Sequence, residues 1–488
     1  MSSDVRADPE PAAPLAQPVS VGRFLQIFSA VMLPMFLAAA DQTLTATATP
    51  SIAAELGGLR DTTWISVGYL IAMTATVPLY GRLGDRYGRR DTLLTALAVF
   101  SAGSLACGLA ASLGMLVVAR VLQGLGGGGL MVMAQSLIGE LVAPRERARF
   151  QGYFATVFTL ANVGGSLIGG LMVHHTGWRW LFLINVPLCL IACWRVLRLP
   201  RGAGNRQSML ADPIGAIAFA TAVTVSLIWT SFAGYRFAWV SGTSLALAAA
   251  SAVLWVVLIR RDMRQSNPFL PIELLRDRSM RYLCLTIVAF ASCLFALIFF
   301  LPILMQVVHG ADARKAGALL LPLTLGIVAG STTTGRIVNR TGRPAEMPVV
   351  GLSISCVALI LMSTLGGPGE RQGELIAALG ALCGFGFGTV MPTAQMVSQT
   401  LAGRERLGAA ASAVSLARYT GAALGTAMFG ALVFAIAPDA ASHVDSSALA
   451  NTAGSAEFSR AIRIGFGALA AVAAAGAWFA SRVQRIKL

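Results

Sequence analysis

The chain has 488 residues, of which 56% are hydrophobic and 12% are charged, and its mean hydropathy is +0.71. Soluble domains carry about 25% charged residues, so a globular aqueous protein is excluded. The formal net charge is +15, but the basic residues lie in the gaps between apolar runs. The positive-inside rule explains that placement better than nucleic-acid binding does, and no nucleic-acid partner is expected.

The chain begins with a segment rich in proline, alanine and acidic residues that lacks the basic start of a signal peptide. This composition predicts a disordered cytosolic tail. Beyond it, runs long enough to cross about 30 Å of hydrocarbon predict about fourteen helices. They lie at 23–48, 63–81, 92–112, 115–140, 150–174, 178–197, 213–233, 238–259, 280–306, 315–334, 347–366, 372–398, 407–436 and 461–481.

The distribution of basic residues predicts the orientation of these helices. Of the 37 lysines and arginines, 27 lie in the tails and in one set of alternate loops, whereas eight lie in the opposite set. Because basic loops stay on the cytosolic side, both termini are expected in the cytosol. The sequence therefore predicts an all-α membrane protein that crosses the bilayer many times.

One turn of the sequence occurs twice. Gly81–Arg90 recurs in a weaker form as Gly335–Arg343, and residues 81, 86, 88 and 89 recur at 335, 340, 342 and 343 with a constant offset of 254. Equivalent turns between apolar helices predict a duplicated helical bundle. Such bundles are typical of solute transporters.

The offset also predicts the domains. We expect a cytosolic tail at 1–21, an N-terminal six-helix bundle at 22–198, an inserted helix pair at 199–260, a cytosolic linker at 261–278, a C-terminal six-helix bundle at 279–482 and a cytosolic tail at 483–488.

Asp41 is the only carboxylate well inside a predicted span. Burying an unpaired carboxylate costs several kcal/mol, so this group must be protonated, paired or in contact with water. Asp41, Thr45 and Thr49 share one helix face. Asp41 is therefore a candidate for binding a proton or a cationic substrate, and the alternative is an aspartate satisfied by neighbouring backbone or by Arg120.

Two arginines lie within predicted spans. Arg120 shares a helix face with Gln123, Gly124 and Gly127, and its depth in the membrane is comparable to that of Asp41. We expect Arg120 to tune the protonation of Asp41, unless the two form a permanent packing pair. Arg418, near the middle of its helix, is a candidate for the central cavity, where it either faces substrate or bonds to helix carbonyls and water.

Several motifs resemble the 14-helix drug:proton antiporter branch of the major facilitator superfamily. Gly81–Arg90 is similar to its loop motif G-x-L-x-D-R-x-G-R-R/K, and Leu116–Gly126 to its helix-four motif. Trp178–Pro187 is similar to the W-R-W-x-F-x-I-N-x-P signature. The second half follows the branch pattern at Leu301, Pro302, Gln306, Gly310, Ala316, Gly317, Leu321 and Pro322, and then at Gly384, Gly386, Gly388 and Pro392.

The resemblance implies the major facilitator fold, with two six-helix bundles, two inserted linker helices and 14 transmembrane helices in all. It also implies a gating loop, which clamps the two halves in the outward-open state, at Gly81, Asp85, Arg86, Gly88, Arg89 and Arg90. A substrate cavity is implied at Asp41, Thr45, Arg120, Gln123, Gln306 and Arg418, with proton coupling assigned to Asp41 and Arg120.

The helix-five antiporter motif G-x-x-x-G-P-x-x-G-G is present only in part. Gly165, Gly169 and Gly170 match it, but Ser166 replaces the proline and Ala161 replaces the first glycine. Proline would distort the helix locally, whereas serine adds only a hydroxyl. The sequence therefore supports transport more strongly than antiport.

Other chemistries find no support in the sequence. The seven cysteines lie in apolar runs without Cys-x-x-Cys spacing, and the four histidines lie at outer helix ends without an acidic cluster. No phosphate-binding loop and no nucleophile–base arrangement is evident. We expect no metal, no cofactor and no enzymatic activity.

The resemblance implies efflux of amphipathic organic compounds or antibiotics, driven by the proton-motive force through alternating access. The alternatives are a dedicated exporter of one metabolite, antibiotic or siderophore, or a proton-coupled solute symporter of the same fold. Expected partners are a lipophilic small molecule, protons and the lipid bilayer of a bacterial cytoplasmic membrane. A periplasmic adaptor and an outer-membrane channel are candidate partners if the cell is Gram-negative.

Overall fold

A computed structural model describes residues 21–56, 62–142, 144–201, 212–232, 237, 241–265, 269–270, 272–307, 320–365, 370–403, 406–436 and 452–484. Within these ranges the regular elements are helices: α1 (Val21–Leu56), α2 (Thr63–Tyr87), α3 (Arg89–Gly108), α4 (Leu113–Leu141), α5 (Pro144–Thr176), α6 (Arg179–Leu183), α7 (Asn185–Leu197), α8 (Pro213–Phe232), α9 (Gly242–Arg264), α10 (Ile272–Arg276), α11 (Arg278–Val307), α13 (Leu321–Thr341), the 3-10 helix η1 (Pro344–Glu346), α14 (Met347–Thr364), α15 (Glu370–Gly388), α16 (Val390–Ala402), α17 (Leu407–Ile436) and α19 (Thr452–Ser481).

Eleven of the described helical segments are long and apolar enough to cross a membrane. Three more long helices, α5, α13 and α17, run alongside them but are not among the eleven. The all-helical membrane architecture is therefore confirmed, whereas the number of fourteen spans stays a prediction. The predicted tail before Val21, the end of the C-terminal tail after residue 484 and the side chain of Gln306 lie outside the described residues.

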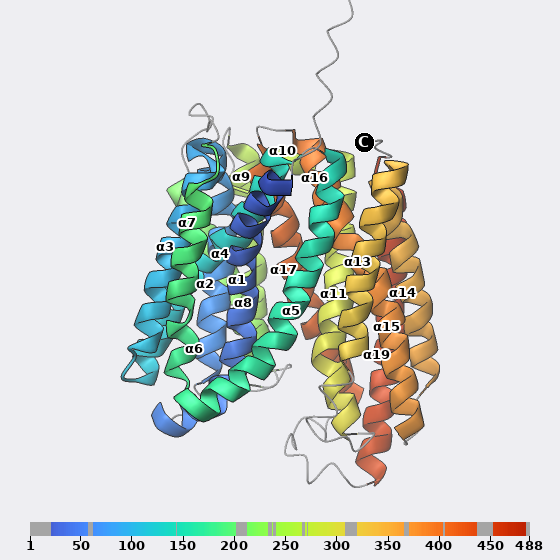
Figure 1. Ribbon diagram of the computed structural model, residues 1–488. Helices are drawn as coiled ribbons and strands as arrows, with labels where there is room; N and C mark the ends of the chain where they lie inside the picture. The colour runs from blue at the N-terminus through green and yellow to red at the C-terminus, as the bar shows by residue number, and fades with distance from the viewer. Residues whose placement is uncertain are drawn as a thin grey trace, which may run out of the picture.

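The helices form two groups side by side (Figure 1). In the first group α2 and α3 both pack on α4, and α1 packs on α5; in the second, α13 and α14 pack on α15, and α11 packs on α17. We call these groups the N-terminal bundle (α1–α7) and the C-terminal bundle (α11–α19). The two have the same packing scheme, as a duplicated bundle requires.

In each of the repeated turns, the glycine that follows the helix has a positive φ. Gly88, which ends α2, has φ +98°, and Gly342, which ends α13, has φ +67°. Only glycine adopts positive φ at little cost, so each turn requires glycine at this position. Both turns lie at the end of the molecule where α1 starts and α19 stops, at the top of Figure 1. We call it the arginine-rich end.

Two prolines explain the two interrupted helices. Pro187 and Pro392 lack the N–H that would bond to the carbonyl four residues earlier. The chain breaks just after those carbonyls, at Ile184 between α6 and α7 and at Thr389 between α15 and α16.

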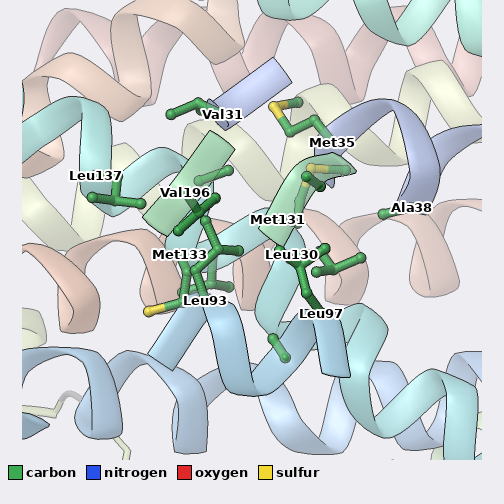
Figure 2. Close-up of a cluster of buried hydrophobic side chains, with 14 of the residues drawn as sticks. Val31, Met35, Ala38, Leu93, Leu97, Leu130, Met131, Met133, Leu137 and Val196 are labelled. Atoms are coloured by element: carbon green, nitrogen blue, oxygen red, sulfur yellow. The ribbon is translucent and has the colours of Figure 1, made fainter. Parts of the chain in front are cut away.

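A buried apolar cluster forms the core of the N-terminal bundle. Figure 2 shows part of it, with side chains from α1, α3, α4 and α7 packed together, including Met35, Leu97, Leu130 and Val196. A separate cluster fills the C-terminal bundle around Phe300, Phe387, Phe429 and Phe466. Each bundle therefore has its own core, which allows the two to move relative to one another.

The helices α8 and α9 form a pair, and α8 packs on α2. Ser226 and Ser251 hydrogen-bond across the pair at 2.7 Å, and Arg261 forms two bonds with the carboxylate of Asp212, at 2.5 and 3.0 Å. The helix α9 continues to Arg264, inside the range predicted as linker, which also contains α10.

Glycines of α4 let its neighbours approach closely, and this predicts a stability effect. A Cβ on Gly126 would lie less than 3.0 Å from the backbone of Ala96 and Phe100 on α3, whereas a Cβ on Gly114 would meet nothing within 4 Å. Because backbone cannot move aside cheaply, we expect Gly126→Ala to lower the free energy of unfolding by about 1–3 kcal/mol. Thermal unfolding in detergent measures this, with Gly114→Ala as control. Equal melting temperatures for both variants would contradict the prediction.

Candidate functional site

A buried ion pair lies inside the N-terminal bundle. Arg120 Nη1 on α4 donates to Asp41 Oδ2 on α1 at 2.6 Å, and each residue is only 1% exposed. Gln123 bridges the two: its Oε1 accepts from Arg120 Nη1 at 2.6 Å and its Nε2 donates to Asp41 Oδ1 at 2.8 Å. A charge pair at this depth is stable only when such extra bonds satisfy it.

Two further polar residues complete this network. Asn185 Nδ2 on α7 donates to Asp41 Oδ1 at 3.2 Å, and Ser104 Oγ on α3 accepts from Gln123 Nε2 at 2.7 Å. Both are buried. Sequence reasoning missed both as site residues, although Asn185 belongs to the W-R-W-x-F-x-I-N-x-P motif. We call Asp41, Arg120, Gln123, Asn185 and Ser104 the buried polar network.

Aromatic rings flank the Arg120 guanidinium. Its central carbon lies 4.2 Å from the ring centroid of Tyr69 and 5.6 Å from that of Phe182, and its Nε donates to the Ile65 carbonyl at 3.3 Å. Cations are attracted to ring faces, most strongly away from water. A Cβ on Gly124 would clash with the backbone of Tyr69, so this glycine allows α2 to approach α4 and place the ring.

Thr45 and Arg418, which were also predicted to line the cavity, lie outside the buried polar network. Thr45 Oγ1 donates to the Asp41 backbone carbonyl at 2.7 Å, and Thr49 Oγ1 to the Thr45 carbonyl at 3.0 Å, so both hydroxyls bond along α1. Arg418 lies on α17, where its Nη2 donates to Tyr419 Oη at 3.1 Å. The structure thus brings Asp41, Arg120 and Gln123 together within one bundle. It records no contact between this group and Arg418 among the described residues.

The predicted gating loop joins the two bundles. Asp85 Oδ1 on α2 accepts from the Gly408 amide at 2.9 Å, and Oδ2 from the Ala409 amide at 3.0 Å, at the start of α17. A carboxylate at a helix N-terminus satisfies unpaired amides and meets the positive end of the helix dipole. Asp85 therefore caps a helix of the opposite bundle.

The arginines of the loop hold Asp85 in place and close neighbouring helix ends. Arg89 donates to Asp85 Oδ1 at 3.0 Å and to Glu140 Oε2 on α4 at 2.9 Å. Arg90 donates to the carbonyls of Val196 and Leu197 at the end of α7. The guanidinium of Arg86 lies 5.4 Å from the Tyr87 ring. Glu140 was not predicted as a site residue, because no motif or spacing in the sequence singles it out.

The bundles touch at further points near the arginine-rich end. A Cβ on Gly81 would lie less than 3.0 Å from the Gly408 carbonyl oxygen, so α2 and α17 are in backbone contact. Ser412 Oγ donates to the Val77 carbonyl at 3.1 Å, and Gln399 Nε2 on α16 to the Gln135 carbonyl on α4 at 3.1 Å. The second copy of the turn differs, because Arg336, Asn339 and Arg340 are all exposed.

The partial antiporter motif of α5 faces α1. A Cβ on Gly165 would clash with Thr43 Oγ1, which itself donates to the Ala161 carbonyl on α5 at 3.3 Å. Gly169 is buried, and the surroundings of Ser166 and Gly170 lie outside the described residues. No group of three or more metal-ligating side chains occurs in the described part of the chain.

An ionic cluster ties the N-terminal bundle together at the end opposite the arginine-rich one. Glu55 Oε2 accepts from Trp178 Nε1 at 2.7 Å, and Glu55 Oε1 pairs with Arg179. Arg179 also donates to the Ala110 carbonyl at 3.2 Å. The Arg179 hydrogen bond, and then that of Trp178, lowers the pKa of the Glu55 carboxyl below its usual 4.5.

This shift predicts a pH dependence of stability. A carboxyl whose pKa is lower in the folded state stabilises the fold above its unfolded pKa and loses that contribution as pH falls through the folded value. We expect the wild type to melt above Glu55→Gln at neutral pH, and the gap to close as pH falls below about 4.5. Melting curves over a pH series measure it, and a gap independent of pH would contradict the prediction.

Comparisons with known proteins agree on a family. The profile of the Major Facilitator Superfamily matches residues 31–426. The multidrug transporter protein MdtP of Bacillus subtilis is 33% identical over 411 residues, which cover 83% of this chain and 75% of that protein. The tetracenomycin C resistance and export protein of Streptomyces glaucescens is 30% identical over 435 residues, covering 89% and 80% respectively.

An MFS-type transporter of Mycobacterium tuberculosis is 34% identical over 433 residues, which are 86% of this chain; the chain spans 62% of that relative's length. Among solved structures, the E. coli fucose:proton symporter FucP aligns with a TM-score of 0.62 and 14% identity, covering 94% of this chain and 98% of that one. That similarity shows the fold. Proteins of this family and fold are in general transporters and not enzymes. The chain is a multi-pass membrane protein that belongs to the major facilitator superfamily.

Proposed function

We propose that the chain exports amphipathic organic compounds across a bacterial cytoplasmic membrane in exchange for protons. The observation that carries the proposal is the ion pair of Asp41 and Arg120, a titratable group buried inside the N-terminal bundle. Intramembrane carboxylates of this kind mark proton and substrate pathways. The printed names of the Bacillus and Streptomyces relatives, a multidrug transporter and an export protein, support efflux as the direction.

The arginine-rich end faces the cytosol in this proposal, because basic loops stay on that side. The contacts of Asp85 and Gly81 with the start of α17 join the bundles there. The described conformation is then closed toward the cytosol. Substrate entry requires these contacts to break, so that the bundles rock about a site between them.

Proton binding involves a change within the buried polar network. Asp41 accepts three hydrogen bonds, from Arg120, Gln123 and Asn185, which is the geometry of an ionised carboxylate. Protonation would remove its charge and weaken the attraction to Arg120. Because Asp41 is 1% exposed, α1 and α4 must separate locally to admit a proton. We assign that separation to the passage between the two access states.

Proton movement in reconstituted vesicles tests the function. Vesicles containing the protein and a pH dye are loaded with a lipophilic xanthene dye and diluted, so that the xanthene dye flows outward. Antiport predicts acidification of the lumen, because protons enter as the dye leaves. Symport would make the lumen alkaline, and a pH trace equal to that of protein-free vesicles would overturn proton coupling.

A panel of competitors separates multidrug export from a dedicated exporter. Unlabelled compounds of unrelated structure are added to the same vesicles, and the dye flux is measured. Inhibition by several unrelated compounds supports multidrug export. Inhibition by one structural class alone supports the dedicated exporter instead.

A further inference from the structure

Arg418 is a cation within α17, far from either end of the helix. Charges at such depths are costly and are normally paired. Arg418 Nη2 donates to the neutral Tyr419 hydroxyl at 3.1 Å, while its Nε has no hydrogen-bond partner in the described part of the chain. No carboxylate of the described residues forms an ion pair with it. Arg120, in contrast, has Asp41 as its counterion.

The position of Arg418 on α17 places it between the two bundles. Ala411 lies seven residues earlier and hence on the same face, and it is packed within the apolar cluster of the N-terminal bundle. Tyr419 packs against that same cluster. Gly421 and Gly425, three and seven residues after Arg418, contact Val288 and Ser292 of α11, so this side of α17 also borders the packing of α17 within its own bundle. Figure 1 shows α17 between the two groups of helices.

The charges of the two sites differ in a way that selects a ligand. The buried polar network is neutral overall, because Asp41 offsets Arg120. Arg418 is partly buried, its Nε is unpartnered and no carboxylate pairs with it among the residues that the structure describes, so within that part of the chain its positive charge is uncompensated. A guanidinium presents parallel N–H groups that fit a carboxylate, and its attraction to an anion grows as water is excluded.

We propose that Arg418, held in place by Tyr419, binds an acidic group of the transported compound. The substrates are then amphipathic organic anions or zwitterions, with a carboxylate as the best geometric match. This inference rests on the proposed export function and narrows its substrate class from amphipathic compounds in general. It predicts that a free carboxylate on an apolar scaffold improves binding.

Equilibrium binding to the full-length protein in detergent tests the inference. The probes are a xanthene dye with a free carboxylate and the methyl ester of the same dye, followed by fluorescence anisotropy. We expect the wild type to bind the acid about tenfold more tightly than the ester, since hydrogen bonds to charged groups are worth about that much. Arg418→Gln should abolish the preference by weakening the acid alone, and Arg418→Lys should retain part of it.

Controls keep the outcome clear. Arg463→Gln removes a cation that is exposed and bonds to the Ser363 carbonyl on a neighbouring helix, and it should change neither affinity. Tyr419→Phe tests the positioning of Arg418 and should reduce the preference while leaving ester binding unchanged. Thermal unfolding of each variant shows whether it is folded. Equal binding of both dyes by the wild type, or an equal loss of both in folded Arg418→Gln, overturns the inference.

This experiment separates the inference from the proposed function. Binding in detergent needs neither a membrane nor a proton gradient. A preference for the acid that depends on Arg418, in a protein that moves no protons in vesicles, would support the anion site and contradict proton-coupled export. Proton-coupled transport of the ester without any preference for the acid would support proton-coupled export and contradict the anion site.

Discussion

Replacing Asp41 with asparagine is expected to reduce substrate-driven proton flux to the level of protein-free vesicles. Asparagine keeps the shape of the side chain and can accept hydrogen bonds from Gln123 and Asn185. It cannot take up a proton in the physiological range, and it no longer offsets the charge of Arg120. Downhill movement of substrate without protons should remain if the two bundles still exchange access states.

The single substitution also leaves a buried cation without its partner. Removing one member of such a pair costs about 3–5 kcal/mol, because the remaining charge is uncompensated. A lost activity could therefore reflect a damaged fold. The double variant Asp41→Asn with Arg120→Gln removes both charges, and we expect it to recover most of the melting temperature while proton coupling stays absent.

The same vesicle assay with an internal pH dye measures this effect. Glu55→Gln is the matched control, because it removes another carboxylate of α1 that is half exposed at the opposite end of the helix. It should leave proton flux unchanged. If the double variant still moved protons at the wild-type rate, the ion pair would contribute to packing alone and not to proton coupling.

The contact between Asp41 and Arg120 could be expected from the sequence because it depends on helix periodicity and depth alone. Residues at i, i+3, i+4 and i+7 share a face, and that spacing put Arg120 beside Gln123 and two glycines. The depth of each helix then matched Arg120 with Asp41. The repeated turn could also be recognised from the sequence, because it depends on local structure. Gly88 and Gly342 both have a positive φ, which favours glycine at each position.

Other parts of the site cannot be predicted from helix periodicity and depth. Ser104 and Asn185 are single polar residues in apolar runs, and their role depends on how α3 and α7 pack around α1 and α4. The partners of Asp85 are backbone amides at Gly408 and Ala409, and any residue except proline supplies an amide. Tertiary packing alone decides which amides lie within hydrogen-bond distance of the Asp85 carboxylate.

Contacts between the bundles depend in addition on the conformational state. Gln399 donates to the Gln135 carbonyl across the two bundles in the described conformation, and no spacing in the sequence connects residues so far apart. The exact ends of helices are equally hard to predict, as the extension of α9 to Arg264 shows. The prediction of fourteen spans rests on the mean hydropathy of each run. That mean does not distinguish polar residues that a helix such as α13 buries against neighbouring helices from polar residues that face outward.

Replacing Gly81 with valine is expected to open the arginine-rich end and stop transport. The α2 and α17 backbones touch at Gly81 and Gly408, and a Cβ on Gly81 would also overlap Ser412. Overpacking of this kind costs about 1–3 kcal/mol, so the closed state should become about 5–150-fold less populated. Asp85→Asn should shift the same equilibrium by less, because one carboxamide oxygen can still accept from the start of α17.

Spin-label distances report the population directly. Labels at Thr95→Cys on α3 and Asn339→Cys on α13 are exposed and belong to opposite bundles, so they separate when the arginine-rich end opens. We expect the short distance to dominate in the wild type, to fall in Asp85→Asn and to be nearly absent in Gly81→Val. Gly114→Val, at a site with open space around it, should match the wild type. If Gly81→Val kept the short distance, contact between these glycines would not be what closes the cytosolic side, and the assignment of the gate to the crossing of α2 and α17 would be wrong.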